Sequence, residues 1–70
     1  MCARPLSEVA ADACGVIVLN HDRQTLDMGL FPGAPVRVLT HHPSNPNLVV
    51  AVGGSRYIIS KKVARQIEVR

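Results

Sequence analysis

The sequence predicts a small, mainly β fold with short helices, in which about five strands close into a barrel. Short runs rich in Val, Ile and Leu alternate along the chain with Gly, Pro and Asn, which is the pattern of strands and turns. With 47% hydrophobic residues but one Phe, one Tyr and no Trp, the core must be aliphatic. A barrel leaves no strand edge exposed, so it suits several short strands. The 70 residues have room for one core, which predicts a single domain over 1–70.

The strands are expected over residues 16–19, 36–40, 48–52, 55–59 and 67–69. The first is a continuous apolar run and is expected to be buried. Gly53 and Gly54 fit a primed two-residue turn, which would pair the third strand with the fourth as a hairpin. The loop over 41–47, HHPSNPN, is too rich in turn residues to continue a strand. Ser60 can cap one or two helical turns within 61–66.

A short helix is expected to begin after Asn20 or Asp22, either of which can cap it, and to run through Met28. Gly29 can adopt the left-handed conformation that ends a helix. Leu30 can then fold back onto the last helical turn.

Pro32 and Gly33 come directly after this helix end and predict a type II turn. Proline presets φ at the second turn position, and glycine accepts the positive φ required at the third. Pro35 lacks an N–H group and suits the first residue of the following strand. The segment 26–38 therefore combines a helix end, a turn and a strand start.

Several classes of protein do not fit the composition. No apolar run approaches the roughly 20 residues of a membrane-spanning helix, so the chain is expected not to be membrane-inserted. The N-terminus has no apolar centre of the kind found in signal peptides, which predicts a cytoplasmic protein. Cys2 and Cys14 are the only cysteines and are expected to remain thiols.

Catalytic signatures are missing from the sequence. It contains no GxxxxGK[ST] and no GxSxG motif, and its five acidic residues form no pairing motif. We therefore expect no enzymatic activity. Three histidines, His21, His41 and His42, are candidate metal ligands, because neutral imidazoles bind Zn²⁺ and Fe²⁺. Their spacing matches no recognised site, so an exposed polar loop and a helix start are the alternative interpretations.

The net charge of +3 favours a negatively charged partner. Nucleic acid is one such partner, but single-strand binding normally uses aromatic platforms, and this chain has only Phe31 and Tyr57. An acidic protein partner is preferred to nucleic acid, which is not expected, and a basic face in contact only with solvent is the alternative interpretation. Five basic residues lie in the last fifteen positions: Arg56, Lys61, Lys62, Arg65 and Arg70.

The turn segment resembles the signature of the FeoA-type family, the cytosolic accessory proteins of bacterial ferrous iron uptake. The residues that match its LxxMGLxPG pattern are Leu26, Met28, Gly29, Leu30, Pro32 and Gly33. Downstream, a Pro-rich loop, the strand LVVAV, a glycine turn, RYII, a short helical turn and IEV follow in the family's order. The resemblance covers residues 6–69. The family usually has one more residue between the leucine and the methionine, or a second leucine there, and the segment before Leu26 is several residues shorter here.

The resemblance implies an SH3-like barrel that acts as an adaptor on the cytosolic, GTPase-containing part of a FeoB-type transporter. It implies no cofactor, although weak binding of Fe²⁺ or another divalent transition metal stays open as an alternative, as do a basic SH3-like barrel that binds nucleic acid and a homo-oligomer. The apolar corner formed by the turn is the expected partner surface, and Phe31 is its expected exposed member. The alternative interpretation is that Leu26, Met28 and Leu30 all belong to the core, because their spacing also fits burial. The residues of this surface are Met28, Leu30, Phe31 and Pro32.

Overall fold

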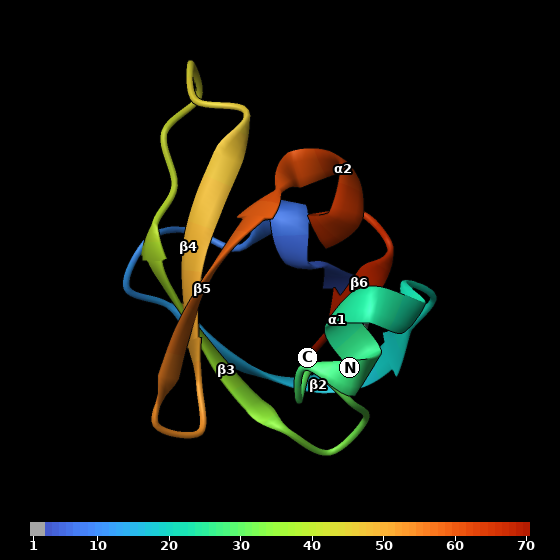
Figure 1. Cartoon of the computed structure of the whole chain (residues 1–70). Coiled ribbons are helices and arrows are strands. Elements are labelled where there is room, and N and C mark those ends of the chain that lie inside the picture. The colour runs from blue at the N-terminus through green and yellow to red at the C-terminus, as the bar shows by residue number, and fades with distance from the viewer. Residues whose placement is uncertain (1–2) are drawn as a thin grey trace.

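The computed structural model describes residues 3–70 and consists of one antiparallel sheet with short helices between its strands (Figure 1). Along the sheet the strands follow the order β1-β6-β2-β3-β4-β5. The strands are β1 (Arg4–Pro5), β2 (Cys14–Asn20), β3 (Pro35–Thr40), β4 (Asn47–Val52), β5 (Ser55–Ser60) and β6 (Ile67–Val69). The helical elements are the 3-10 turn η1 (Leu6–Glu8) and the helices α1 (Arg23–Asp27) and α2 (Lys61–Ala64).

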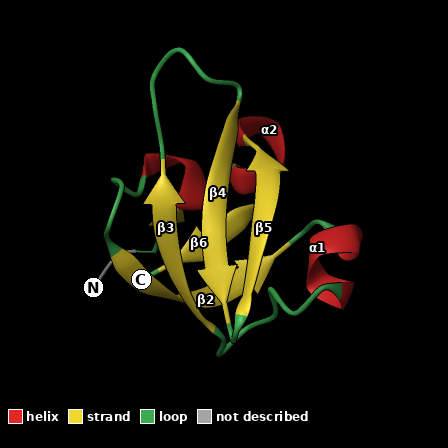
Figure 2. Cartoon of the chain, turned by 60° about the vertical axis from the view of Figure 1, so that its left-hand side comes forward, coloured by secondary structure: helices red, strands yellow, loops and turns green. Residues whose placement is uncertain are grey.

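Strand β2 belongs to both halves of the sheet. Its first residues pair with β3, and its later residues pair with β6 after a change of register between Ile17 and Leu19. The sheet curls around this strand, so that β3, β4 and β5 cross in front of β2 and β6 (Figure 2). Gly15 permits the close approach of β6, because a Cβ there would lie only 3.1 Å from the carbonyl oxygen of Arg70.

The core lies inside the curl and is aliphatic, as the composition predicts. Along β4 and β3 alternate residues point inward, which is the two-residue period of a sheet with one buried face. The 3-10 turn η1 and helix α2 close one end of the core with apolar side chains. The buried apolar residues are Leu6, Val9, Ile17, Leu30, Ala34, Val36, Val38, Leu48, Val50, Val52, Ile59, Ala64, Ile67 and Val69.

The mainly β architecture is confirmed, with two corrections. The structure has six strands in the described residues rather than about five, because the two-residue β1 also pairs with β6. The sheet is curled but not closed: in the described residues β5 pairs only with β4, and β1 only with β6. Two edges therefore remain where a closed barrel would have none.

The expectation of a fully buried strand over residues 16–19 is wrong. Ile17 is completely buried, but Val16 is 37% exposed and Leu19 is 42% exposed. Only one face of β2 meets the core, and the shift of register after Ile17 turns the end of the strand outward. A continuous apolar run does not distinguish such a bent strand from one that is covered on both faces.

Helix α1 has a hydrogen-bonded cap at each end. At its start, Thr25 donates its backbone N–H to Oδ2 of Asp22 at 2.9 Å. At its end, Gly29 has a φ of 115° and donates its N–H to the carbonyl of Leu26 at 3.2 Å. The N–H of Leu30 reaches back to the carbonyl of Thr25 at 3.0 Å. These two bonds form a Schellman motif, which reverses the chain direction within two residues.

The next two residues make a second reversal. Gly33 has a φ of 95°, and the N–H of Ala34 donates to the carbonyl of Phe31 at 3.0 Å, as in a type II turn. In the β4–β5 hairpin Gly53 has a φ of 59°, whereas the φ of Gly54 is not positive, which is the pattern of a type II′ turn.

Asn20 links the end of β2 to both ends of α1. Its Nδ2 donates to the carbonyl of Leu30 at 2.8 Å and to Oγ1 of Thr25 at 3.0 Å. Its Oδ1 accepts the N–H of Asp22 at 2.8 Å. A helix of five residues is marginal by itself, so these bonds and the burial of Leu30 hold it against the sheet.

We predict that Gly29→Val lowers the free energy of unfolding by about 1–3 kcal/mol. A Cβ at Gly29 would meet no atom within 4 Å, so the loss would come from backbone strain at a φ of 115°. Urea unfolding measures the change. The matched control is Gly54→Ala, which also enters open space but at a φ that is not positive, and it should stay within about 1 kcal/mol of the wild type. Equal midpoints for wild type and Gly29→Val would contradict the prediction.

Candidate docking surface

The turn between α1 and β3 separates its apolar side chains into buried and exposed ones. Leu30 is completely buried in the core, whereas Phe31 is 52% exposed. Met28 is half-buried against the core, and Pro32 is exposed. Leu30 therefore anchors the turn in the core. The expectation that it belongs to the partner surface is wrong, because no partner can reach its side chain. Met28, Phe31 and Pro32 remain accessible.

An apolar groove of about 400 Å³ lies beside these residues. One wall comes from Met28, Gly29, Phe31 and residues 33–35, and the other from residues 52–55, which form the tip of the β4–β5 hairpin. Tyr57 stabilises this arrangement: its hydroxyl donates to the carbonyl oxygen of Met28 at 2.9 Å. The fold thus brings together two turns that are about twenty residues apart in the sequence.

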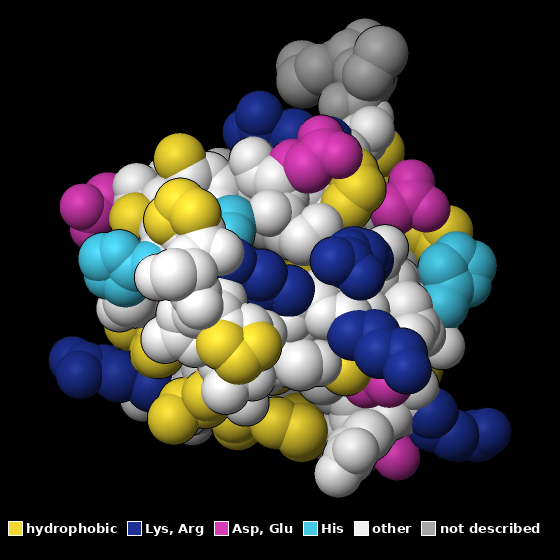
Figure 3. Space-filling model, turned by 90° about the horizontal axis from the view of Figure 1, so that it is seen from above, with side chains coloured by type: hydrophobic (Ala, Val, Ile, Leu, Met, Phe, Trp, Pro, Cys, Tyr) yellow, Lys and Arg dark blue, Asp and Glu magenta, His cyan; other side chains and the backbone are white. Residues whose placement is uncertain are grey.

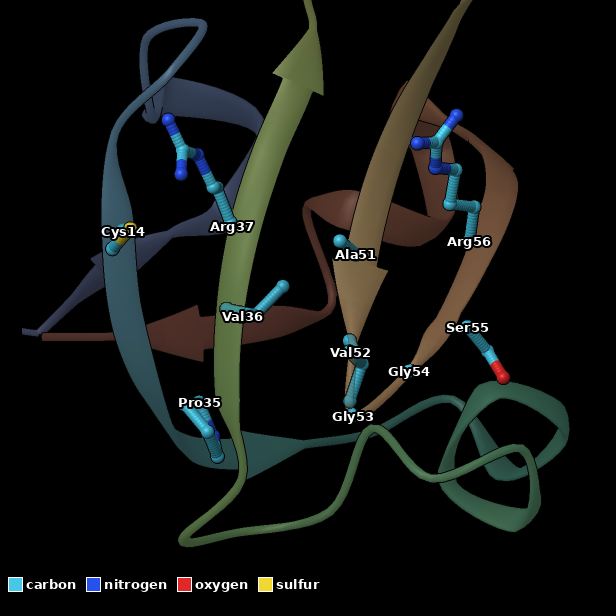
Figure 4. A pocket seen from close by; sticks show the side chains of 10 residues that line it. All are labelled: Cys14, Pro35, Val36, Arg37, Ala51, Val52, Gly53, Gly54, Ser55 and Arg56. Carbon is cyan, nitrogen blue, oxygen red and sulfur yellow. The ribbon is translucent and has the colours of Figure 1, made fainter.

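Two further depressions continue this groove. The first, of about 430 Å³, shares the hairpin tip and extends over the exposed face of the sheet, where it is lined by Cys14, Arg37, Ala51 and Arg56 (Figure 4). The second, of about 220 Å³, shares Met28 and lies between α1 and the end of β5.

Arginines flank the depression on the sheet face. Arg37, Ala51 and Arg56 lie side by side on β3, β4 and β5, so the small Ala51 separates two guanidinium groups (Figure 4). Arg37 also lies 3.9 Å from Oδ1 of Asp12, in an exposed ion pair. An exposed pair of this kind contributes little to stability and leaves the cation accessible. The surface beside the hairpin tip therefore combines apolar walls with positive charge.

Within residues 3–70 the structure does not place any of the three candidate metal-binding histidines in a set of three or more ligands. His21 Nε2 lies 4.0 Å from Oε2 of Glu68, and both groups are partly exposed. His41 hydrogen-bonds through Nδ1 to the carbonyl oxygen of Val9 at 2.8 Å, which joins the 41–46 loop to the end of η1. His42 is exposed. Within residues 3–70 no group of three or more His, Cys, Asp or Glu is positioned to hold a metal ion.

Cys14 is exposed on β2, and Cys2 lies outside the described residues, so the prediction that both remain thiols stays a prediction.

Basic side chains gather near the centre of the face that is seen from above in Figure 3. The ammonium group of Lys61 is hydrogen-bonded within the protein, because its Nζ donates to the carbonyl oxygens of His42 at 2.7 Å and of Pro43 at 3.2 Å. No helix within residues 3–70 has the length and apolarity to cross a membrane.

Sequence reasoning identified one wall of the groove but missed the other. The pattern around Gly53 and Gly54 predicts only a turn, and Tyr57 with Phe31 supplies too few aromatic platforms to predict stacking on nucleic acid. A single tyrosine in an otherwise aliphatic hairpin was the available signal, because a half-buried Tyr hydroxyl usually has a hydrogen-bond partner. Here the partner is the carbonyl of Met28, 29 residues away in the sequence, and local sequence does not encode such a distant contact.

Comparison with known proteins agrees with this architecture. A family model described as the FeoA domain matches residues 4–70. The crystal structure of an iron uptake regulatory protein, FeoA, superposes with a TM-score of 0.85 at 40% identity, covering 100% of this chain and 97% of that one. FeoA from Stenotrophomonas maltophilia, described as a prokaryotic SH3 domain protein and solved with zinc, gives 0.78 at 26% identity over 97% of this chain and 91% of that one.

The same fold occurs in a larger protein. A manganese-dependent transcriptional repressor superposes with a TM-score of 0.88 at 20% identity, and the match covers 97% of this chain but 40% of the repressor. This likeness concerns the fold alone. A comparison with curated proteins found no significant match. Because the family model spans nearly all of the chain and a full-length relative shares 40% of its residues, the chain belongs to the FeoA family.

Proposed function

We propose that this protein is an accessory protein of ferrous iron uptake that docks on the cytosolic, GTPase-containing part of a FeoB-type transporter. Membership of the FeoA family supports the role in iron transport. The observation that carries the docking proposal is the half-exposed Phe31 beside the apolar groove of residues 28–35 and 52–55. An exposed aromatic residue next to a groove is a typical anchor in protein recognition.

The rigidity of the groove supports the same function. One wall carries a Schellman motif and a type II turn, and the other is a two-residue hairpin turn, so neither wall needs to become ordered when a partner binds. Ordering of side chains and loops is a main cost of association, and a preorganised groove avoids much of that cost. The arginines beside the groove favour a partner surface that carries carboxylates.

We predict that the cytosolic part of the cognate transporter, added to ¹⁵N-labelled protein, shifts the amide resonances of residues 28–35 and 52–55. Amides of the far face, such as those of β1 and β6, should not move. A parallel titration uses Fe²⁺ alone under anaerobic conditions. Saturable shifts at His21, His41 or His42 with Fe²⁺, together with none from the transporter domain, would replace docking with metal binding as the function.

We further predict that Phe31→Ala weakens binding of the transporter domain by about tenfold, which corresponds to about 1.4 kcal/mol. Its thermal unfolding midpoint should stay close to the wild-type value, since half of the side chain is already exposed. Leu19→Ala, an exposed apolar residue on β2, is the matched control and should leave binding unchanged. Calorimetric titration measures both affinities. A large fall in the midpoint of Phe31→Ala would instead assign Phe31 to the core.

A further inference from the structure

No strand of the described residues pairs with the outer edge of β5. β5 is the last strand of the sheet order, and β4 is its one partner in the part of the chain that the structure describes. The N–H of Lys61 donates to the carbonyl of Pro46 at 2.8 Å. This hydrogen-bonded pair comes directly after the pair of Asn47 with Ser60, so it fixes which pairs of the hairpin are hydrogen-bonded. Because opposite pairs in an antiparallel ladder alternate between bonded and non-bonded, Arg56 and Ile58 occupy non-bonded positions.

The backbone groups of Arg56 and Ile58 consequently point away from β4. Each residue presents one N–H and one C=O at the open edge. Neither residue makes another backbone hydrogen bond within residues 3–70. Their side chains lie on the outer face, and Ile58, at 72%, is more exposed than the other large apolar side chains of the described residues. An edge with free backbone groups and an exposed apolar residue is a template for another strand.

The groove follows the same edge. Ser55, at the start of β5, lines the apolar groove at the hairpin tip, whereas Ile58, at the far end, lines the smaller cavity beside α1. Met28 lines both depressions, and Tyr57 lies between them with its hydroxyl on the carbonyl of Met28. The two depressions therefore lie at opposite ends of β5 and share Met28 as a lining residue.

We propose that β5 receives an extended segment of a protein partner by strand addition, with acidic side chains toward Arg56 and apolar side chains in the groove beside Met28. The proposal rests on the proposed function, since it specifies how the docking partner binds. An added strand would lie about 4.8 Å from β5 and send alternate side chains to opposite faces. The side chains on one face of the added strand would enter the two depressions, and those on its other face would lie beside the side chains of Arg56 and Ile58.

Charge decides which kind of segment fits. Arg56 is the one charged residue of β5, and no carboxylate within residues 3–70 forms an ion pair with it. Opposite charges on neighbouring strands stabilise a sheet, whereas like charges destabilise it. A second copy of this chain would offer another β5 without any acidic residue, so self-pairing lacks this complement. A partner strand that alternates acidic and apolar residues supplies it.

The decisive variant is Ile58→Pro, because it removes an outward N–H while the bonds between β4 and β5 remain. Proline is tolerated at edge positions of this kind. We expect Ile58→Pro to weaken binding of the transporter's cytosolic part by at least about tenfold. Ile58→Thr, the matched control, keeps the N–H and should stay within about threefold. If Ile58→Pro does not fold, amide exchange of the wild-type complex replaces it: protection of the amides of Arg56 and Ile58 is expected, and unchanged exchange overturns the proposal.

A second probe separates this proposal from the proposed function. The blocked peptide Val-Glu-Val-Glu-Val should shift the amides of Arg56 and Ile58 and bind more tightly than Val-Lys-Val-Lys-Val. If the transporter domain binds but Ile58→Pro has no effect, strand addition is overturned and the accessory function stands. If the transporter domain does not bind, the proposed accessory function is overturned, and the peptide titration alone tests strand addition. Glu-dependent shifts along β5 then support strand addition, and their absence overturns it.

Discussion

The positive φ of Gly29 is the constraint on which the rest of this surface depends. It lets the N–H groups of Gly29 and Leu30 return to the last turn of α1, and the chain reverses within two residues. Leu30 is thereby buried completely, and Phe31 is turned toward solvent. A β-branched residue at this position would strain the reversal that produces both results. One backbone conformation thus supplies a core anchor and an exposed aromatic side chain in consecutive positions.

The second constraint is the division of β2 between two sets of partners. Because its first half pairs with β3 and its second half with β6, the sheet curls enough to enclose an aliphatic core without hydrogen-bonding into a closed barrel. At the far end of the sheet this leaves β5 with no paired strand beyond β4 among residues 3–70. The same bend that builds the core therefore leaves the edge on which we propose that a partner strand is added.

Apolar contact and charge have different roles on this surface. The groove beside Met28 and Phe31 offers contact area that is largely preformed, which favours affinity. The guanidinium groups of Arg37 and Arg56 lie on the exposed face, where their attraction to carboxylates is screened by salt. Such rim charges affect mainly the rate of association and the choice of partner. The histidines belong to neither role in the described structure, because none of them lies in a group of three or more metal ligands there.

Local sequence determined the elements whose geometry depends on adjacent residues. Asp22 and Ser60 cap their helices through bonds three residues away, and the strands over 36–40, 48–52 and 55–59 follow from alternation and turn residues. Tertiary structure decided the rest. The two-residue β1 exists only because β6 lies beside it, and the burial of Leu30 but not Phe31 depends on where the core lies. Likewise, the groove forms only because the curl of the sheet carries Gly53 and Tyr57 to the end of α1. These features arise from contacts between residues far apart in the chain, which no local pattern encodes.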